Sequence, residues 1–164
     1  ICMQYIMSLD QGTTSSRCIL FDKNGAAVST AQKEYRQIYP QPGWVEHDPM
    51  EIWNSILETI AMAAEEAGIQ VADLTCMGLD NQGETVILWD RYTGVPVYNA
   101  IVWQCRRTAD RIDQLKQQGL EEYIRKTTGL VPDCLFFCYQ DCMDLDHVPQ
   151  GRERAKKERS CLER

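Results

Sequence analysis

An eight-residue polar loop, DQGTTSSR at residues 10–17, constrains the fold most, because apolar residues flank it on both sides. Tyr5 to Leu9 is predicted to form a buried strand, and Cys18 to Phe21 a second one. The loop between them is then a tight turn that projects its side chains and amides outward. Asp22 to Gly25 predicts a further turn, and Ala27 to Gln32 a returning strand. The chain is therefore expected to open as an antiparallel meander.

A long amphipathic helix is predicted after a loop over residues 37–49. Asp48 is its expected N-cap, Pro49 its first residue and Gly68 its end. The rest of the chain alternates strand and helix patterns, with strands over 74–79, 85–89 and 97–103, and helices over 108–118 and 120–126 that break at Gly119. This order of elements indicates a mixed α/β domain.

Composition excludes several classes of protein. With 164 residues, 44% hydrophobic and 25% charged, the chain is neither disordered nor fibrous and has the length of one domain. Its 24 acidic and 17 basic side chains give a net charge of −7, which argues against nucleic-acid binding. No apolar run is long enough to span a bilayer, and the first residues do not resemble a signal peptide. We therefore expect no membrane partner and a cytoplasmic location.

The polar loop carries the groups that phosphate binding requires. Gly12 lets the backbone approach a ligand closely, and three hydroxyl residues follow it: Thr13, Thr14 and Ser15. Asp10 offers a hard oxygen ligand for Mg²⁺, and Arg17 adds a fixed positive charge. The alternative is a polar hairpin turn with an Asx-type cap and no ligand.

The chain has eight cysteines, and three of them, Cys134, Cys138 and Cys142, are spaced four residues apart. On a helix, three such thiols would share one face and could hold zinc or an iron–sulfur cluster. The alternative is that the cysteines are not ligands. The first four, at positions 2, 18, 76 and 105, then act as reduced core thiols.

Four segments in order resemble the glycerol kinases of the FGGY family: YIMSLDQGTTSSR, QIYPQPGWVEHDPMEIW, NQGETVILWDRYTGVPVYNAIVWQCRRTAD and GLEEYIRKTTGLVPD. The resemblance covers Tyr5 to Asp133. It implies the N-terminal lobe of an actin-like ATPase (ribonuclease H-like) fold, with a mixed β-sheet flanked by helices. Residues 1–133 would form this N-terminal kinase domain, and residues 134–164 an atypical continuation of it.

The resemblance also implies roles for single residues. Gly12, the three hydroxyl residues and Arg17 would contact the phosphates of ATP, and Asp10 would position Mg²⁺. Glu84 would accept hydrogen bonds from glycerol hydroxyls, and Trp103 would pack on the carbon backbone of glycerol. The alternatives are a solvated loop carboxylate for Glu84 and an ordinary core residue for Trp103.

Two positions depart from the family pattern within the expected glycerol site. Gly83 stands where the family has a glycerol-binding arginine, and Leu135 where it has a tyrosine. Loss of a charged donor to a buried hydroxyl would cost roughly 1.5–3 kcal/mol of binding free energy. Glycerol affinity is therefore expected to fall by about one to two orders of magnitude.

The sequence after Asp133 is consistent with a shifted reading frame. One DNA string encodes the family-like AYFSATKIAWI in one frame and CLFFCYQDCMD, residues 134–144, when read one base earlier. A family-like LDHV then returns at Leu145. A second shift, from EKGALLFGT to KKERSCLER, accounts for residues 156–164 in the same way. The cysteines at 134, 138, 142 and 161 would then be products of the wrong frame.

These observations favour the N-terminal part of an ATP-dependent glycerol kinase, which converts glycerol and ATP to glycerol 3-phosphate and ADP. The resemblance places the catalytic-base aspartate beyond residue 164, so the chain alone is expected to be inactive. A homo-oligomer is possible for the intact protein. Two alternatives remain: a non-catalytic relic of a decayed kinase gene, and a module that binds phosphate or a partner.

Overall fold

The computed structural model describes residues 4–135 and the backbone of residues 160–163. The chain divides into two compact units. Unit 1 comprises Ile1–Gln37 and Asp48–Gln82, and unit 2 comprises Ile38–His47 and Gly83–Arg164. The polar loop lies in unit 1, and both expected glycerol residues, Glu84 and Trp103, lie in unit 2. The boundary predicted at residue 133 remains a prediction.

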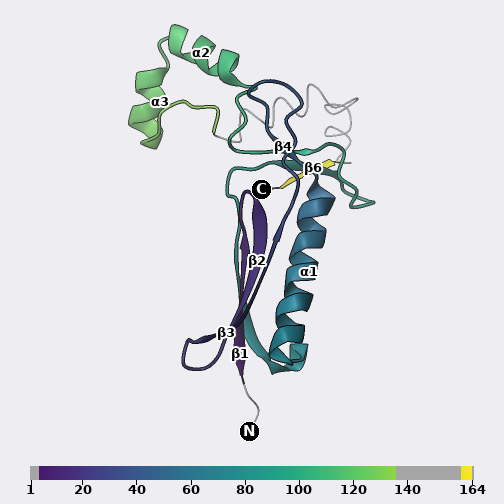
Figure 1. The fold of residues 1–164 in the computed structure, drawn as a ribbon. Coiled ribbons are helices and arrows are strands. Elements are labelled where there is room, and N and C mark those ends of the chain that lie inside the picture. Colours follow the sequence, from purple (N-terminus) through teal and green to yellow (C-terminus); the bar gives the residue numbers. More distant parts are fainter. Residues whose placement is uncertain (1–3, 136–159, 164) are drawn as a thin grey trace. The chain divides into compact units, whose positions relative to one another are not determined.

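Unit 1 contains a four-stranded sheet in the order β3-β2-β1-β5. Its strands are β1 (Tyr5–Gln11), β2 (Ser15–Phe21), β3 (Ala27–Glu34) and β5 (Leu74–Asp80). The β1–β2 and β2–β3 pairs are antiparallel, whereas β5 runs parallel to β1 (Figure 1). The predicted meander is confirmed, and each of its strands is longer than its apolar pattern indicated.

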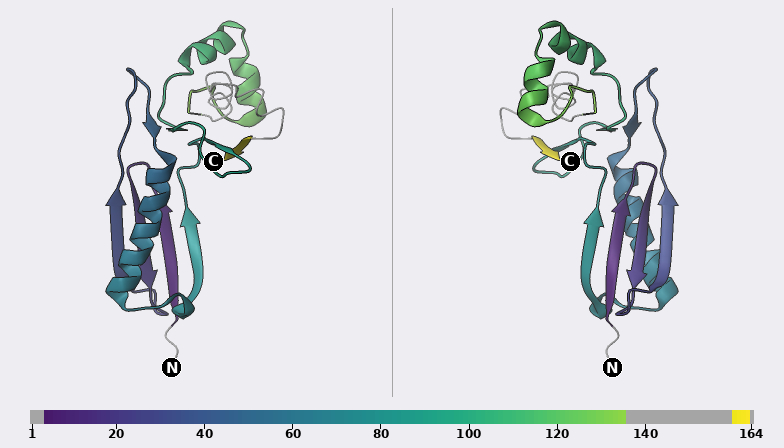
Figure 2. Two further views of the ribbon diagram at one scale, coloured as in Figure 1. Left: turned by 90° about the vertical axis from the view of Figure 1, so that its right-hand side faces the viewer. Right: turned by 90° about the vertical axis from the view of Figure 1, so that its left-hand side faces the viewer.

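Helix α1 (Pro49–Ala67) lies along one face of this sheet (Figure 2). The Asp48 carboxylate accepts the N–H of Met50 at 2.8 Å, and Gly68 ends the helix with a φ of 64°. The predicted cap, first residue and end are therefore all confirmed. A short 3₁₀ helix, η1 (Val71–Asp73), precedes β5.

The core of unit 1 lies between α1 and the sheet. Alternate residues of the strands face the helix, since the strand period is two. The buried members of this core are Tyr5, Met7, Leu9, Cys18, Leu20, Ala31, Ala63 and Ile69. A buried hydrogen bond of 2.7 Å between the hydroxyls of Ser16 and Ser55 joins β2 to α1.

Unit 2 is built from shorter elements. Strand β4 (Glu46–His47) pairs with β7 (Ala100–Ile101), and β6 (Ile87–Asp90) pairs with β8 (Ser160–Glu163). Helices α2 (Ala109–Gln117) and α3 (Glu121–Thr128) follow, with Gly119 between them at a φ of 74°. The two predicted helices and their break are confirmed.

The strand predicted over residues 97–103 is wrong, because only Ala100–Ile101 pair as β7. Before β7, the side chains of Tyr98 and Asn99 both donate to the carboxylate of Glu46. After it, the N–H of Cys105 donates to the carbonyl of Val102 at 2.8 Å, which turns the chain. Side-chain bonding before the strand and a turn after it replace the expected ladder.

The described cysteines form no cluster. Cys18, Cys105 and Cys134 are buried, whereas Cys76 is exposed on β5, so its expected place as a core thiol is wrong. Within residues 4–135, no three His, Cys, Asp or Glu side chains gather at metal-binding distance. The cysteines at 138 and 142, and the residues of the proposed first frame shift beyond 135, lie outside the described residues. No described helix combines the length and apolarity needed to cross a membrane.

Candidate functional site

The loop between β1 and β2 is a tight turn that requires glycine. The N–H of Gly12 donates to the carbonyl of Ser15 at 3.0 Å. A Cβ at position 12 would lie 3.1 Å from that same carbonyl oxygen, closer than ordinary contacts allow. The absence of a side chain at Gly12 therefore permits the close approach on which the turn depends.

The loop carbonyls are hydrogen-bonded from one neighbouring group of residues. The Gly12 carbonyl accepts from the Gln11 amide at 2.8 Å and from the Tyr35 hydroxyl. The Thr13 carbonyl accepts from the Gln37 amide at 3.2 Å. The backbone N–H of Tyr35 donates to the carbonyl of Thr14 at 3.3 Å. Tyr35 and Gln37 had no place in the sequence interpretation, since they lie more than 20 residues from the carbonyls that they bond.

Tyr35 remains a neutral phenol over the whole physiological range. Burial raises its pKa to about 12, and the nearby negative charge of Asp10 acts in the same direction. The hydrogen bond from Gln11 opposes them only in part. The hydroxyl therefore keeps the proton that it donates to the loop.

Asp10 lies in a row of polar residues across the sheet. It is the register partner of Arg17 on β2 and of Asp80 on the parallel strand β5. The guanidinium of Arg17 donates to the side-chain carbonyl of Gln32 at 3.0 and 3.2 Å. The sequence interpretation missed Asp80, because the strand that it predicted ended at residue 79. The carboxyl ends of neighbouring parallel strands lie at the same edge of a sheet. An Asp at the end of each of two predicted strands was therefore a signal that could have identified Asp80.

This donor set fits Mg²⁺, which the resemblance implies. Asp10 and Asp80 are carboxylates in register on neighbouring strands, and Mg²⁺ prefers oxygen ligands of this kind. A side chain at position 12 would crowd the carbonyl of Ser15, so glycine suits this tight turn of the loop.

The segments that carry the two expected glycerol residues pair with each other within unit 2. Val86 and Ile101 exchange two backbone hydrogen bonds of 3.0 Å in an antiparallel bridge. The N–H of Trp103 donates to the hydroxyl of Thr85, the residue after Glu84, at 3.4 Å. Glu84 and Trp103 are both half-buried, so neither is a fully exposed loop residue nor a fully buried core residue.

A buried ion pair supports the strand that leads to Trp103. Arg107 donates to the carboxylate of Glu46 at 2.5 Å, and both side chains are at most 3% exposed. Tyr98 and Asn99 each donate to the same carboxylate at 2.9 Å. The guanidinium of Arg107 also lies 3.9 Å above the ring of Trp44. These contacts hold β4 and β7 together with the turn that follows them.

The electrostatics of this pair favour its charged state. Burial acts to raise the pKa of Glu46, but hydrogen bonds from Asn99, Arg107 and Tyr98 outweigh it and leave the pKa below its ordinary value. Burial acts to lower the pKa of Arg107, but its bonds to Cys105 and Glu46 raise it overall. Both side chains therefore stay ionised despite burial.

The two departing residues lie in well-defined positions. Gly83 has a φ of 69°, and no atom lies within 4 Å of the place where its Cβ would be. An arginine there would have space but an unfavourable backbone conformation. Leu135 is half-buried, and its N–H donates to the carboxylate of Asp133 at 3.0 Å.

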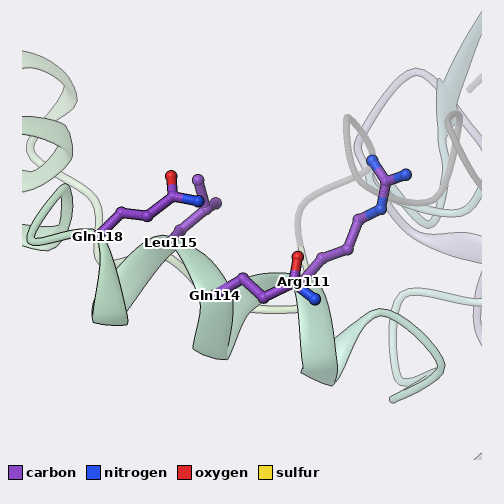
Figure 3. A pocket seen from close by; sticks show the side chains of 4 residues that line it. All are labelled: Arg111, Gln114, Leu115 and Gln118. Carbon is purple, nitrogen blue, oxygen red and sulfur yellow. The ribbon is translucent and has the colours of Figure 1, made fainter.

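A small pocket lies on α2, and none of the predicted site residues lines it. Figure 3 shows its four lining side chains, Arg111, Gln114, Leu115 and Gln118. They come from consecutive turns of one helix, and none was predicted to contact a ligand. This pocket is therefore not the candidate site.

Comparison with known proteins identifies the relatives of the chain. Residues 5–158 match the N-terminal domain of the FGGY family of carbohydrate kinases. Glycerol kinase 2 of Thermotoga maritima is 57% identical over 155 residues, 94% of this chain. A glycerol kinase of Klebsiella pneumoniae is 55% identical over 154 residues. The chain spans only 31% of the length of each of these relatives.

Solved structures agree with these sequence relatives. A Plasmodium falciparum glycerol kinase crystallised with ADP superimposes with a TM-score of 0.89 over 99% of this chain and 32% of its own, at 28% identity. A gluconate kinase of Lactobacillus acidophilus, at 23% identity and a TM-score of 0.78 over 88% of this chain and 29% of its own, supports the fold alone. The predicted actin-like ATPase fold is confirmed. The chain belongs to the FGGY family of carbohydrate kinases and aligns with the N-terminal third of its glycerol kinases.

Proposed function

We propose that this chain is the N-terminal part of an ATP-dependent glycerol kinase, located in the cytoplasm, that transfers the terminal phosphoryl group of ATP to glycerol. The hydrogen bond from the backbone N–H of Trp103 to the hydroxyl of Thr85 carries the glycerol part of this proposal, because Thr85 directly follows Glu84 in the sequence. These two side chains suit a small polyol, since a carboxylate would accept hydrogen bonds from its hydroxyls and an aromatic ring would cover its carbon atoms.

The loop of unit 1 supplies the phosphate part of the proposal. Gly12 allows close approach of the backbone, and hydroxyls at Thr13, Thr14 and Ser15 add donors for phosphate oxygens. Asp10 would hold Mg²⁺ directly or through water, and Asp80 would add a second carboxylate. The ion would neutralise charge on the phosphates, the main requirement for phosphoryl transfer. Arg17 would add positive charge near the same phosphates.

The chain by itself is expected to give no turnover, because about two thirds of each relative lies outside it. A chimera that adds the remaining two thirds from a relative would therefore test the proposal. Residues 1–133 of this chain would be joined, at the aligned position, to the remainder of the Thermotoga maritima glycerol kinase 2. We expect this chimera to phosphorylate glycerol, with ADP release as the measurement.

The substitution Gly83→Arg in this chimera tests the glycerol site. It should lower the KM for glycerol by about 10- to 100-fold, because it restores a charged donor. Unchanged KM values would contradict the placement of glycerol beside Glu84. A second chimera joined after Arg164, which keeps residues 134–164, is expected to be inactive if the frame shifts are real.

A further inference from the structure

Three consecutive carbonyls of the loop are fixed by hydrogen bonds. The carbonyls of Gly12, Thr13 and Thr14 all accept hydrogen bonds, and the donors come from Gln11, Gln37 and Tyr35. In a planar trans peptide, the N–H points opposite to the carbonyl of the same peptide group. The amides of the three following residues are therefore directed away from these donors, as in the backbone concavities that bind anions.

The hydroxyl of Tyr35 makes a full set of hydrogen bonds. It donates to the carbonyl of Gly12 and accepts from the side-chain amides of Gln11 at 2.9 Å and Gln82 at 3.1 Å. A phenol has one donor and two acceptor positions, so all three are used. Tyr35 is only 9% exposed. Phenylalanine would fill the same volume but would make none of these bonds.

Gln82 connects this hydroxyl to a distant segment of the sequence. Its amide donates to the Tyr35 hydroxyl and, at 3.3 Å, to the side-chain carbonyl of Gln11. Gln82 lies 47 residues from Tyr35 and immediately precedes Gly83 and Glu84. One side chain, that of Tyr35, thus contacts both the phosphate loop and the start of the segment that carries Glu84.

We propose that Tyr35 is a positioning residue whose hydroxyl orients the Gly12–Ser15 loop toward phosphate and couples this loop, through Gln82, to the Gly83–Glu84 segment. The inference rests on the proposed function for the identity of the ligand. The orientation of the loop itself can be measured without any ligand.

The test compares Tyr35→Phe with Tyr5→Phe in the full 164-residue chain. Tyr5 is a buried tyrosine at the opposite end of β1, so it controls for the loss of a phenol hydroxyl elsewhere in the same sheet. Backbone ¹⁵N relaxation should show order parameters near 0.85 in the native loop, falling below about 0.6 in Tyr35→Phe only. Residues 81–83 should become mobile in the same variant. The affinity for Mg·ADP, measured by calorimetry, should fall about fivefold or more.

Gln82→Ala gives a second test for the case that Tyr35→Phe fails to fold. Its side chain is only half-buried, and its loss should loosen Thr13 and Thr14 although they lie far from it in sequence. Unchanged order parameters in the loop of both variants would overturn the inference. A native chain that binds no Mg·ADP, with the expected mobility in Tyr35→Phe, would support the positioning role and count against the proposed function.

Discussion

Unit 1 carries the candidate phosphate loop and unit 2 the candidate glycerol residues, and the two units are built differently. Unit 1 has one continuous sheet covered by a 19-residue helix, and its core is apolar. Unit 2 has strands of two to four residues, and a buried ion pair between Glu46 and Arg107 supports β4 and β7. Unit 2 also buries apolar side chains, among them Val86, Leu88 and Ile101. The two units therefore differ in their ion pairs: unit 2 adds a buried pair to its apolar packing, whereas the described pairs of unit 1 are exposed.

The largest expected effect comes from breaking the buried pair of unit 2. Arg107→Ala leaves the Glu46 carboxylate buried without its cation, and this should cost about 3–5 kcal/mol of unfolding free energy. The exposed pair between Lys33 and Glu58 in unit 1 is the matched control, since Lys33→Ala should cost no more than about 1 kcal/mol. Urea unfolding followed by residue-resolved hydrogen exchange would assign each loss to its unit. Equal losses in the two variants would contradict the comparison.

Apolar truncation should give the corresponding loss in unit 1. Leu20 is completely buried on β2, so Leu20→Ala should lower the unfolding free energy by about 3 kcal/mol through the cavity that it leaves. Ile19→Ala, on the same strand at a half-buried position, is the control and should cost less. Urea midpoints would check the difference. Similar values for the two variants would contradict the assignment of Leu20 to the core face of β2 and of Ile19 to the opposite face.

Alkaline pH should destabilise unit 1 through Tyr35. Its folded pKa is about 12 and its unfolded pKa about 10, so the unfolded chain releases the proton first. Stability from this group is complete below pH 10 and is lost as the pH rises toward 12, by up to about 3 kcal/mol. Tyr35→Phe should flatten this part of the pH profile of unfolding. An unchanged profile in that variant would assign the alkaline loss to other groups.

The smallest effect concerns the end of α1. Gly68 has a φ of 64°, and nothing lies within 4 Å of its would-be Cβ. Gly68→Ala should therefore cost only the backbone penalty, about 1 kcal/mol. Gly78→Ala, in open space on β5 without a positive φ, is the control and should cost less. Thermal unfolding would compare the stabilities of the two variants. An equal loss of stability would mean that the positive φ at Gly68 does not cause the destabilisation by alanine.

The sequence predicts unit 1 well because its signals are local. Strand alternation, the Asp48 cap and the Gly68 end each depend on neighbouring residues, and all were confirmed. The turn at Gly12 follows from the same kind of signal. The parts of the site that escaped prediction depend on distant residues, as in the contact of Tyr35 with Gln82 and the register of Asp10 with Asp80.

Unit 2 was harder to predict for the same physical reason. The Glu46 carboxylate accepts hydrogen bonds from residues 52 to 61 positions away in the sequence. Two of these donors, Tyr98 and Asn99, lie in the segment that was predicted to be a strand. An alternating apolar pattern does not predict hydrogen bonds of this kind. The resemblance to a family predicts roles for Glu84 and Trp103, and the structure adds a hydrogen bond from the N–H of Trp103 to the hydroxyl of Thr85, the residue after Glu84.

The phosphorylation of glycerol by the chimera, measured with and without Asp10→Asn, tests the central claim most directly. The chimera carries residues 1–133 with Gly83→Arg, followed by the remainder of the Thermotoga maritima relative. We predict glycerol-dependent release of ADP from ATP, reduced about 100-fold or more by Asp10→Asn, while the 164-residue chain alone gives none. Full activity in the Asp10→Asn chimera, or turnover by the 164-residue chain alone, would contradict the account.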